Sequence, residues 1–240
     1  SETHLPTADA ISVSAVAVDV DGDGDIDLFV GRRDGGNELL LNDGTGHFEA
    51  SPERDWLDVQ TRVANGSAWG DYDRDGDLDV FVMNYGNWVG AWLTDHEERT
   101  APSPIDDYLW ENLGDGTFAN ASLELPDDEM ADAFIFAGGW WDLDQDGWLD
   151  LYLVNDHRGD YSWALPTLHY RGGPDGFEEV GAELSTRLST EGMGLAAGDI
   201  NGDAEIDFLV NARQEYLMLS DGLGRWYMAS LALGLSSAEE

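Results

Sequence analysis

The sequence predicts an all-β protein built from four repeats, each of about four antiparallel strands. Three observations lead to this prediction. A nine-residue acidic segment occurs four times, a β-forming run follows each copy at once, and a glycine-rich turn between β-forming residues follows further on. The chain has 240 residues, of which 42% are apolar, so it is long enough to bury a sizeable core.

The first two strands of each repeat flank its acidic segment. The segments, called acidic loops 1 to 4 below, read DVDGDGDID at 19–27, DYDRDGDLD at 71–79, DLDQDGWLD at 142–150 and DINGDAEID at 199–207. Small and apolar residues before each loop predict the first strand, at 14–18, 66–70, 137–141 and 194–198. β-forming residues after each loop predict the second strand, at 28–31, 80–84, 151–155 and 208–211.

The third and fourth strands of each repeat are predicted as a hairpin. An apolar stretch, a glycine turn and an aromatic residue follow one another at 39–48, 108–118, 168–177 and 217–227. We expect a single propeller-like domain over 1–240, with repeats at about 12–55, 62–123, 133–182 and 191–232.

The spacing within the acidic loops is typical of a site for a hard cation. Oxygen-bearing side chains at positions 1, 3, 5 and 9, with a glycine at position 6, can wrap an ion that prefers six to eight oxygen ligands. Calcium fits this ligand set better than magnesium, which demands a tighter octahedron, or zinc, which prefers histidine and cysteine. Position 7 is Trp148 in loop 3, and a tryptophan side chain cannot bind calcium, so we expect this position to contribute its backbone oxygen.

Two alternatives would explain the loops differently. An EF-hand begins with the same spacing, but it needs a glutamate at position 12, where this sequence has Val30, Val82, Leu153 and Val210. Solvated acidic turns would account for one isolated copy. Four copies in the same strand-loop-strand context favour a bound metal instead.

The recurrence of loop and hairpin together, as in GSAWGDYDRDGDLDVFVMN and YLWENLGDGTFANAS, carries a resemblance to a known family. It resembles the FG-GAP or VCBS repeats of integrin alpha-subunit propellers and of the cartilage-acidic-protein-like and ASPIC/UnbV group. This resemblance implies a β-propeller in which each repeat forms one four-stranded blade, with calcium held between the first two strands. Four repeats are compatible with a closed ring or with a piece of a longer array.

Carried over by position, the resemblance implies up to four calcium ions and a ligand set in each loop. The implied ligands are Asp19, Asp21, Asp23, Asp25 and Asp27; Asp71, Asp73, Asp75, Asp77 and Asp79; Asp142, Asp144, Asp146, Trp148 through its carbonyl, and Asp150; and Asp199, Asn201, Asp203, Glu205 and Asp207. Loop 4 departs from the pattern because Ala204 replaces the glycine. A left-handed backbone at this position would cost about 1 kcal/mol or more.

Charge and composition exclude several functions. The chain has 50 acidic residues against 11 Lys and Arg, and its formal charge of −39 repels nucleic acids and anionic membranes. It has no cysteine for disulfides or thiolate metal sites, and no apolar run long enough to span a membrane. The start at Ser1, without methionine or apolar leader, suits a mature secreted chain and equally suits a trimmed piece of a longer one. For an extracellular chain without disulfides, calcium is the expected stabilising element.

The second repeat carries an insertion of about 20 residues before its hairpin, which contains Trp88, Trp92 and His96. Long loops on a rigid scaffold often carry binding sites, so these three residues are candidates for binding a glycan or a partner protein. The alternative is that the tryptophans cover the edge of the repeat. Asn65 and Asn120 begin glycosylation sequons.

These observations together predict a calcium-binding extracellular repeat protein that acts as a structural, adhesion or self-assembly module. Its expected partners are other protein subunits or copies of itself. We expect no enzyme, because no nucleophile elbow, phosphate loop or zinc signature is present. A polysaccharide-binding or polysaccharide-cleaving, lyase-like propeller is the alternative function.

Overall fold

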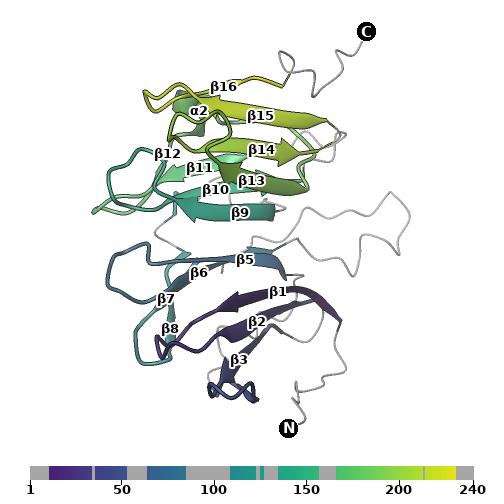
Figure 1. The fold of residues 1–240 in the computed structure, drawn as a ribbon, viewed down its shortest axis with the longest axis vertical. Coiled ribbons are helices and arrows are strands. Elements are labelled where there is room, and N and C mark those ends of the chain that lie inside the picture. The colour runs from purple at the N-terminus through teal and green to yellow at the C-terminus, as the bar shows by residue number, and fades with distance from the viewer. Residues whose placement is uncertain are drawn as a thin grey trace. The chain divides into compact units, whose positions relative to one another are not determined.

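The computed structural model describes residues 11–33, 36–52, 64–84, 109–122, 125–126, 135–156, 166–212 and 214–230. This described part is all-β, as predicted, with sixteen strands and one short helix. The strands form four antiparallel sheets of four strands each, and neighbouring strands in every sheet are consecutive in the chain (Figure 1).

Each sheet lies within the range of one predicted repeat. Sheet 1 contains β1 (Ser12–Val18), β2 (Asp27–Arg32), β3 (Glu38–Asn42) and β4 (Phe48–Ala50). Sheet 2 contains β5 (Ala64–Gly70), β6 (Asp79–Asn84), β7 (Leu109–Asn112) and β8 (Phe118–Asn120). Sheet 3 contains β9 (Ile135–Trp141), β10 (Asp150–Asn155), β11 (Leu168–Arg171) and β12 (Glu178–Glu179). Sheet 4 contains β13 (Gly194–Gly198), β14 (Asp207–Asn211), β15 (Glu215–Ser220) and β16 (Trp226–Met228).

The second strands of sheets 2 and 3 are the most buried strands of their sheets. Every residue of β6 and of β10 is buried, so both faces of these strands are covered. Their sequences, DVFVMN and DLYLVN, are therefore apolar runs that do not alternate with polar residues.

The chain divides into two compact units, Ser1–Ala131 and Asp132–Glu240. In the first unit, Phe29, Leu39, Val80 and Val82 are buried together between sheets 1 and 2. Trp69 packs edge-on against Phe29 and Phe118, with ring centroids 5.8 and 6.3 Å apart. Burial of each such side chain contributes roughly 1.5–3 kcal/mol to folding.

The second unit has its own core between sheets 3 and 4. The rings of Tyr152 and Phe208 stack with centroids 4.4 Å apart, and Trp226 is buried in the same cluster. The short helix α2 (Gly181–Leu184), which the repeat pattern does not predict, adds Leu184 to this core. The single domain predicted over 1–240 stays a prediction, since each unit contains a complete pair of sheets.

In the part of the chain that the structure describes, no helix has the length and apolar character needed to cross a membrane.

Candidate metal centres in the acidic loops

Each acidic loop joins the first strand of its sheet to the second strand, and position 9 is the first residue of that second strand. These aspartates are almost completely buried; they are Asp27, Asp79, Asp150 and Asp207. In loop 1, the Val20 N–H donates to Asp27 Oδ2 (2.9 Å) and the Asn42 N–H of β3 donates to Asp27 Oδ1 (2.8 Å). Position 9 thus fastens the loop to the third strand.

The same pair of backbone donors recurs in the other three sheets. Each position-9 aspartate accepts one N–H from position 2 of its loop and one from the end of the third strand or the residue after it. The donors are Tyr72 and Asn112 for Asp79, Leu143 and Gly172 for Asp150, and Ile200 and Ser220 for Asp207. Burial raises the pKa of Asp79 and of Asp150 to about 7, and the backbone hydrogen bonds only partly oppose this shift. Burial also raises the pKa of Asp27.

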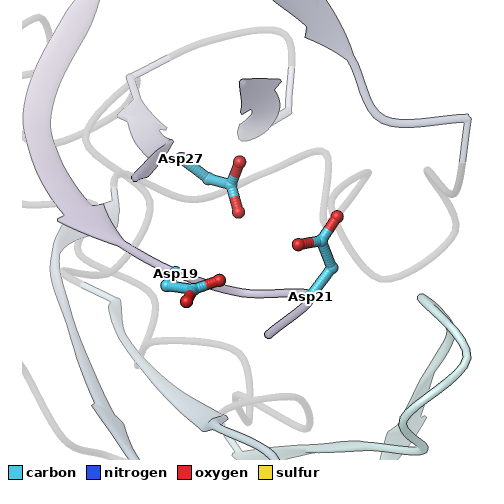
Figure 2. Close-up of side chains that lie close together, drawn as sticks. All are labelled: Asp19, Asp21 and Asp27. Carbon is cyan, nitrogen blue, oxygen red and sulfur yellow. The ribbon is translucent and has the colours of Figure 1, made fainter. Parts of the chain in front are cut away.

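Carboxylates from three of the loops converge. In loop 1, Asp19, Asp21 and Asp27 each offer one oxygen to a group whose atoms all lie within 4.8 Å of one another. Figure 2 shows these three side chains turned toward a common space. Loop 2 brings together Asp71, Asp73 and Asp79 in the same way, and loop 3 brings together Asp142, Asp144 and Asp146.

Position 1 contributes an oxygen in each of these groups that is shielded from solvent. Asp19 Oδ1, Asp71 Oδ1 and Asp142 Oδ1 are buried and accept no hydrogen bond from any described residue. In loops 1 and 3 the other oxygen accepts the N–H of position 6, from Gly24 and Gly147 respectively, at 3.0 Å. A buried carboxylate oxygen without a donor is costly unless a cation lies beside it. The donor set therefore fits a hard metal ion.

Positions 3 and 5 shape the loop backbone. In loop 1, Asp21 accepts the N–H of Asp23, and Asp23 accepts the N–H of Asp25, at 3.3 and 2.8 Å. Loops 2 and 3 repeat both bonds, through Asp73, Asp75, Asp144 and Asp146. One oxygen of each side chain holds a tight turn in this way, a role that short acidic side chains commonly take.

Position 7 directs its side chain to the hairpin turn in the first two repeats. The carboxylate of Asp25 lies so close to Gly44 that a Cβ there would overlap it, and Asp77 stands in the same relation to Gly114. Both glycines also have positive φ, 75° and 73°. The backbone oxygen of position 7 as a ligand, Trp148 included, stays a prediction.

Two positions of every loop have a left-handed backbone. Position 6 has positive φ as expected, including φ 70° at Ala204. Position 4 has positive φ too, at Gly22, Arg74, Gln145 and Gly202. Glycine at position 4 of loops 1 and 4 suits this conformation, but the conformation could not be predicted for all four loops, because arginine and glutamine rarely adopt it.

In loop 4, N–H groups of the loop itself donate hydrogen bonds to the loop's own carboxylates. Asp199 Oδ1 accepts the N–H groups of Gly202 (2.6 Å) and Asp203 (3.1 Å), and its Oδ2 accepts that of Ala204 (3.0 Å). The Asn201 side-chain amide donates to Asp203 Oδ2 at 2.9 Å. Glu205 accepts a hydrogen bond from Gln145 of loop 3. Asp207 keeps the two backbone bonds of position 9. Asp199 thus accepts three backbone N–H groups, whereas one such bond is present at Asp19 and one at Asp142 among the described residues.

A side chain from the hairpin region binds the carbonyl of position 8. Asn42 Nδ2 donates to the Ile26 carbonyl and Asn112 Nδ2 to the Leu78 carbonyl, at 3.0 and 3.2 Å. In repeat 4, Trp226 Nε1 donates to the Ile206 carbonyl instead, at 2.8 Å. Asn42 and Asn112 precede the hairpin turns of repeats 1 and 2. This recurrence was the available signal for the contact with position 8, which was not predicted.

The two sequon asparagines lie in different surroundings. Asn65 is in β5, and its Nδ2, the atom that would carry a sugar, is buried. Asn120 is exposed at the end of β8. Trp88, Trp92 and His96 lie outside the described residues, so their candidacy as binding residues stays a prediction.

A comparison with protein-family models agrees with the repeat pattern. A family model described as FG-GAP-like repeat matches residues 19–82 and 142–210, more than half of the chain. No curated protein matches the sequence significantly. Among solved structures, the chain is similar to a lectin of Agrocybe aegerita that recognises non-reducing terminal N-acetylglucosamine, with 15% identity and a TM-score of 0.41. The similarity covers 89% of this chain and 64% of the lectin. On the family match, this chain is a member of the FG-GAP-like repeat family.

Proposed function

We propose that this chain is a calcium-binding extracellular module that serves structure, adhesion or self-assembly and is not an enzyme. One observation carries the metal assignment. In loops 1 to 3, a buried position-1 oxygen without a hydrogen-bond donor among the described residues lies within a group of three carboxylates. Such a group of like charges is unfavourable without a positive partner.

The residues that would hold the ion are oxygen donors throughout. They are Asp19, Asp21 and Asp27 in loop 1, Asp71, Asp73 and Asp79 in loop 2, and Asp142, Asp144 and Asp146 in loop 3. Calcium accepts six to eight oxygens in flexible geometry, which suits carboxylates supplemented by backbone oxygens and water. The ion would supply positive charge, and the side chains would then hold the first strand, the loop and the second strand in fixed register.

We propose three ions per chain, with loop 4 outside the set. Asp199 already accepts three backbone N–H groups, and Asn201 supplies an amide where the other loops have a carboxylate. Loop 4 would then keep its shape without a metal.

Isothermal titration of the metal-stripped chain with calcium tests this proposal. We expect three ions to bind, and Asp19→Ala, Asp71→Ala and Asp142→Ala each to remove one. Asp199→Ala is the matched control, since it changes the same position in loop 4 and should leave the number of ions unchanged. Absence of binding at millimolar calcium would refute the metal assignment, and loss of an ion in Asp199→Ala would restore the fourth site.

The proposed partners are further copies of the chain or other protein subunits. The formal charge of −39 would repel nucleic acid. It would also repel other copies of the chain unless cations bind between them. Light scattering in millimolar calcium and after chelation tests self-association. A large particle that dissociates on chelation supports assembly, whereas a monomer under both conditions contradicts it.

Glycan binding remains the alternative function, with Trp88, Trp92 and His96 as its predicted residues. It predicts quenching of tryptophan fluorescence by a glycan, with loss of the response in Trp88→Ala and Trp92→Ala. No response across a glycan panel would remove this alternative.

We also propose that the four sheets are the blades of one β-propeller. Two observations support this proposal: the family membership of the chain and the consecutive strand order in each sheet.

A further inference from the structure

In loop 3, a positively charged side chain from the third strand of the sheet lies against one of the carboxylates. Arg171 is the last residue of β11, and its Nε lies 3.5 Å from Asp144 Oδ2. Asp144 occupies position 3 and belongs to the proposed metal group of loop 3. The arginine therefore contacts one of the oxygens that a metal ion would use.

The position of Arg171 in its sheet is defined by a bond common to all four repeats. The next residue, Gly172, donates its N–H to the position-9 aspartate, as Asn42, Asn112 and Ser220 do in the other sheets. The residues equivalent to Arg171 are then Leu41, Glu111 and Leu219. None of these three can donate positive charge to a loop.

Arg171 is held near the loop by a second acidic residue. Its Nη1 lies 3.7 Å from Glu178 Oε2, and Glu178 is the register partner of Arg171 in β12. About a third of the side chain of Arg171 and of Asp144 is exposed, whereas Glu178 is mostly exposed. The guanidinium can therefore turn toward Glu178 and solvent without breaking a buried contact.

We propose that Arg171 competes with calcium for Asp144 and weakens the metal site of loop 3. This inference rests on the proposed function. Before the ion binds, the guanidinium neutralises part of the carboxylate cluster. When the ion binds, Asp144 leaves the arginine, and a positive charge remains close to the divalent ion. Both effects lower the affinity of loop 3 for calcium.

The test uses terbium, a luminescent ion with oxygen-ligand preferences like those of calcium, excited through tryptophan. Trp148 is itself position 7 of loop 3, so the part of the signal that is lost in Trp148→Phe reports this loop. We expect Arg171→Leu to tighten terbium and calcium binding at loop 3 by about threefold to tenfold. Leucine is accommodated at the equivalent position of sheets 1 and 4, so the variant should fold.

Two further variants separate the local charge from other causes. Arg171→Lys keeps the charge and should bind the metal as the parent does. Arg187→Leu removes an arginine of similar exposure that pairs with Glu179 at 3.6 Å, so it should leave the affinity of loop 3 unchanged. In chelator, Arg171→Leu should also unfold at a lower temperature than the parent, whereas in calcium this difference should shrink or reverse.

The outcomes distinguish this inference from the proposed function. Unchanged affinity in Arg171→Leu, or an equal gain in Arg187→Leu, would overturn the role of Arg171 while the metal sites stand. Failure of the parent chain to bind either terbium or calcium would instead refute the proposed function itself.

Discussion

At the scale of single residues, the aspartate at position 9 has a role that is independent of any metal. Its two oxygens accept backbone N–H groups from the loop and from the third strand in all four sheets. From the sequence this residue is expected only to bind an ion, because a spacing pattern does not show which backbone donors the fold brings to it.

Loop 4 allows the structural role to be measured separately. Asp207→Asn replaces one of two acceptor oxygens by an N–H₂ group, which would face the N–H of Ile200 or of Ser220. We expect a loss of about 1–3 kcal/mol in the free energy of unfolding, measured by urea denaturation in chelator. Asp203→Asn, in the exposed part of the same loop, is the control and should cost much less. Equal losses in the two variants would contradict the structural role.

Ala204 carries a conformational strain that glycine would relieve. Its φ is 70°, where an L-residue other than glycine is disfavoured. We expect Ala204→Gly to stabilise the protein by about 0.5–1 kcal/mol, after allowing for the greater entropy of glycine in the unfolded chain. The reverse change, Gly24→Ala at φ 91°, meets no atom within 4 Å of the added Cβ and should destabilise through backbone strain. Unfolding curves that move the same way for both variants would be inconsistent with this account.

At the scale of elements, the strand-loop-strand units and the hairpins could be predicted because each carries a local signal. The strands are short β-forming runs, and their ends are marked by acidic or glycine-rich turns. The helix α2 could not be predicted, because four residues give no helical periodicity. The hydrogen bonds within loop 4 and the contact between Arg171 and Asp144 of loop 3 could not be predicted either. They depend on the directions of side chains, which the spacing of residues alone does not determine.

The third strand of sheet 3 places a histidine where it cannot easily take a proton. His169 packs edge-on against Tyr152 and Trp226, and its Nδ1 is 3.0 Å from Thr186 Oγ1. Burial, with a smaller contribution from Arg171, lowers the pKa of His169 to about 3. Between this value and 6.5 the unfolded chain binds a proton that the folded chain does not. The stability that this histidine contributes above pH 6.5 is therefore lost as the pH falls toward 3.

We expect this residue to add a slope of about 1.4 kcal/mol per pH unit to the free energy of unfolding over that range. Urea denaturation at several pH values should give a flatter profile for His169→Gln than for the parent chain. His47→Gln makes the same substitution at an exposed histidine that pairs with Glu49, and it serves as the control for the substitution itself. Parallel profiles for the parent and His169→Gln would show that the buried imidazole does not cause the acid sensitivity.

At the scale of the whole molecule, the charge of −39 opposes compactness. The three carboxylate groups concentrate part of this charge, whereas the remaining acids are spread over the chain. Composition alone could predict the repulsion, but not which carboxylates gather at shared points, since that depends on the loop backbone.

Salt should therefore stabilise the chelated protein. Raising sodium chloride from about 0.05 to about 0.5 M shortens the screening length severalfold, so the thermal midpoint in chelator should rise by several degrees. In millimolar calcium the rise should be smaller, because the carboxylate groups already have counter-charge. Scanning calorimetry with and without chelator measures both, and equal salt dependence in the two conditions would argue against metal binding at these groups.

The side chain of Asn112 reaches beyond its own sheet. Besides the Leu78 carbonyl, its Nδ2 donates to the carbonyl of Val20, in the loop of the preceding repeat, at 3.0 Å. A gene segment cut between the first two repeats would therefore leave loop 1 without one of its buried donors. A gene segment that encodes repeats 1 and 2 together would keep this contact when it is duplicated or moved.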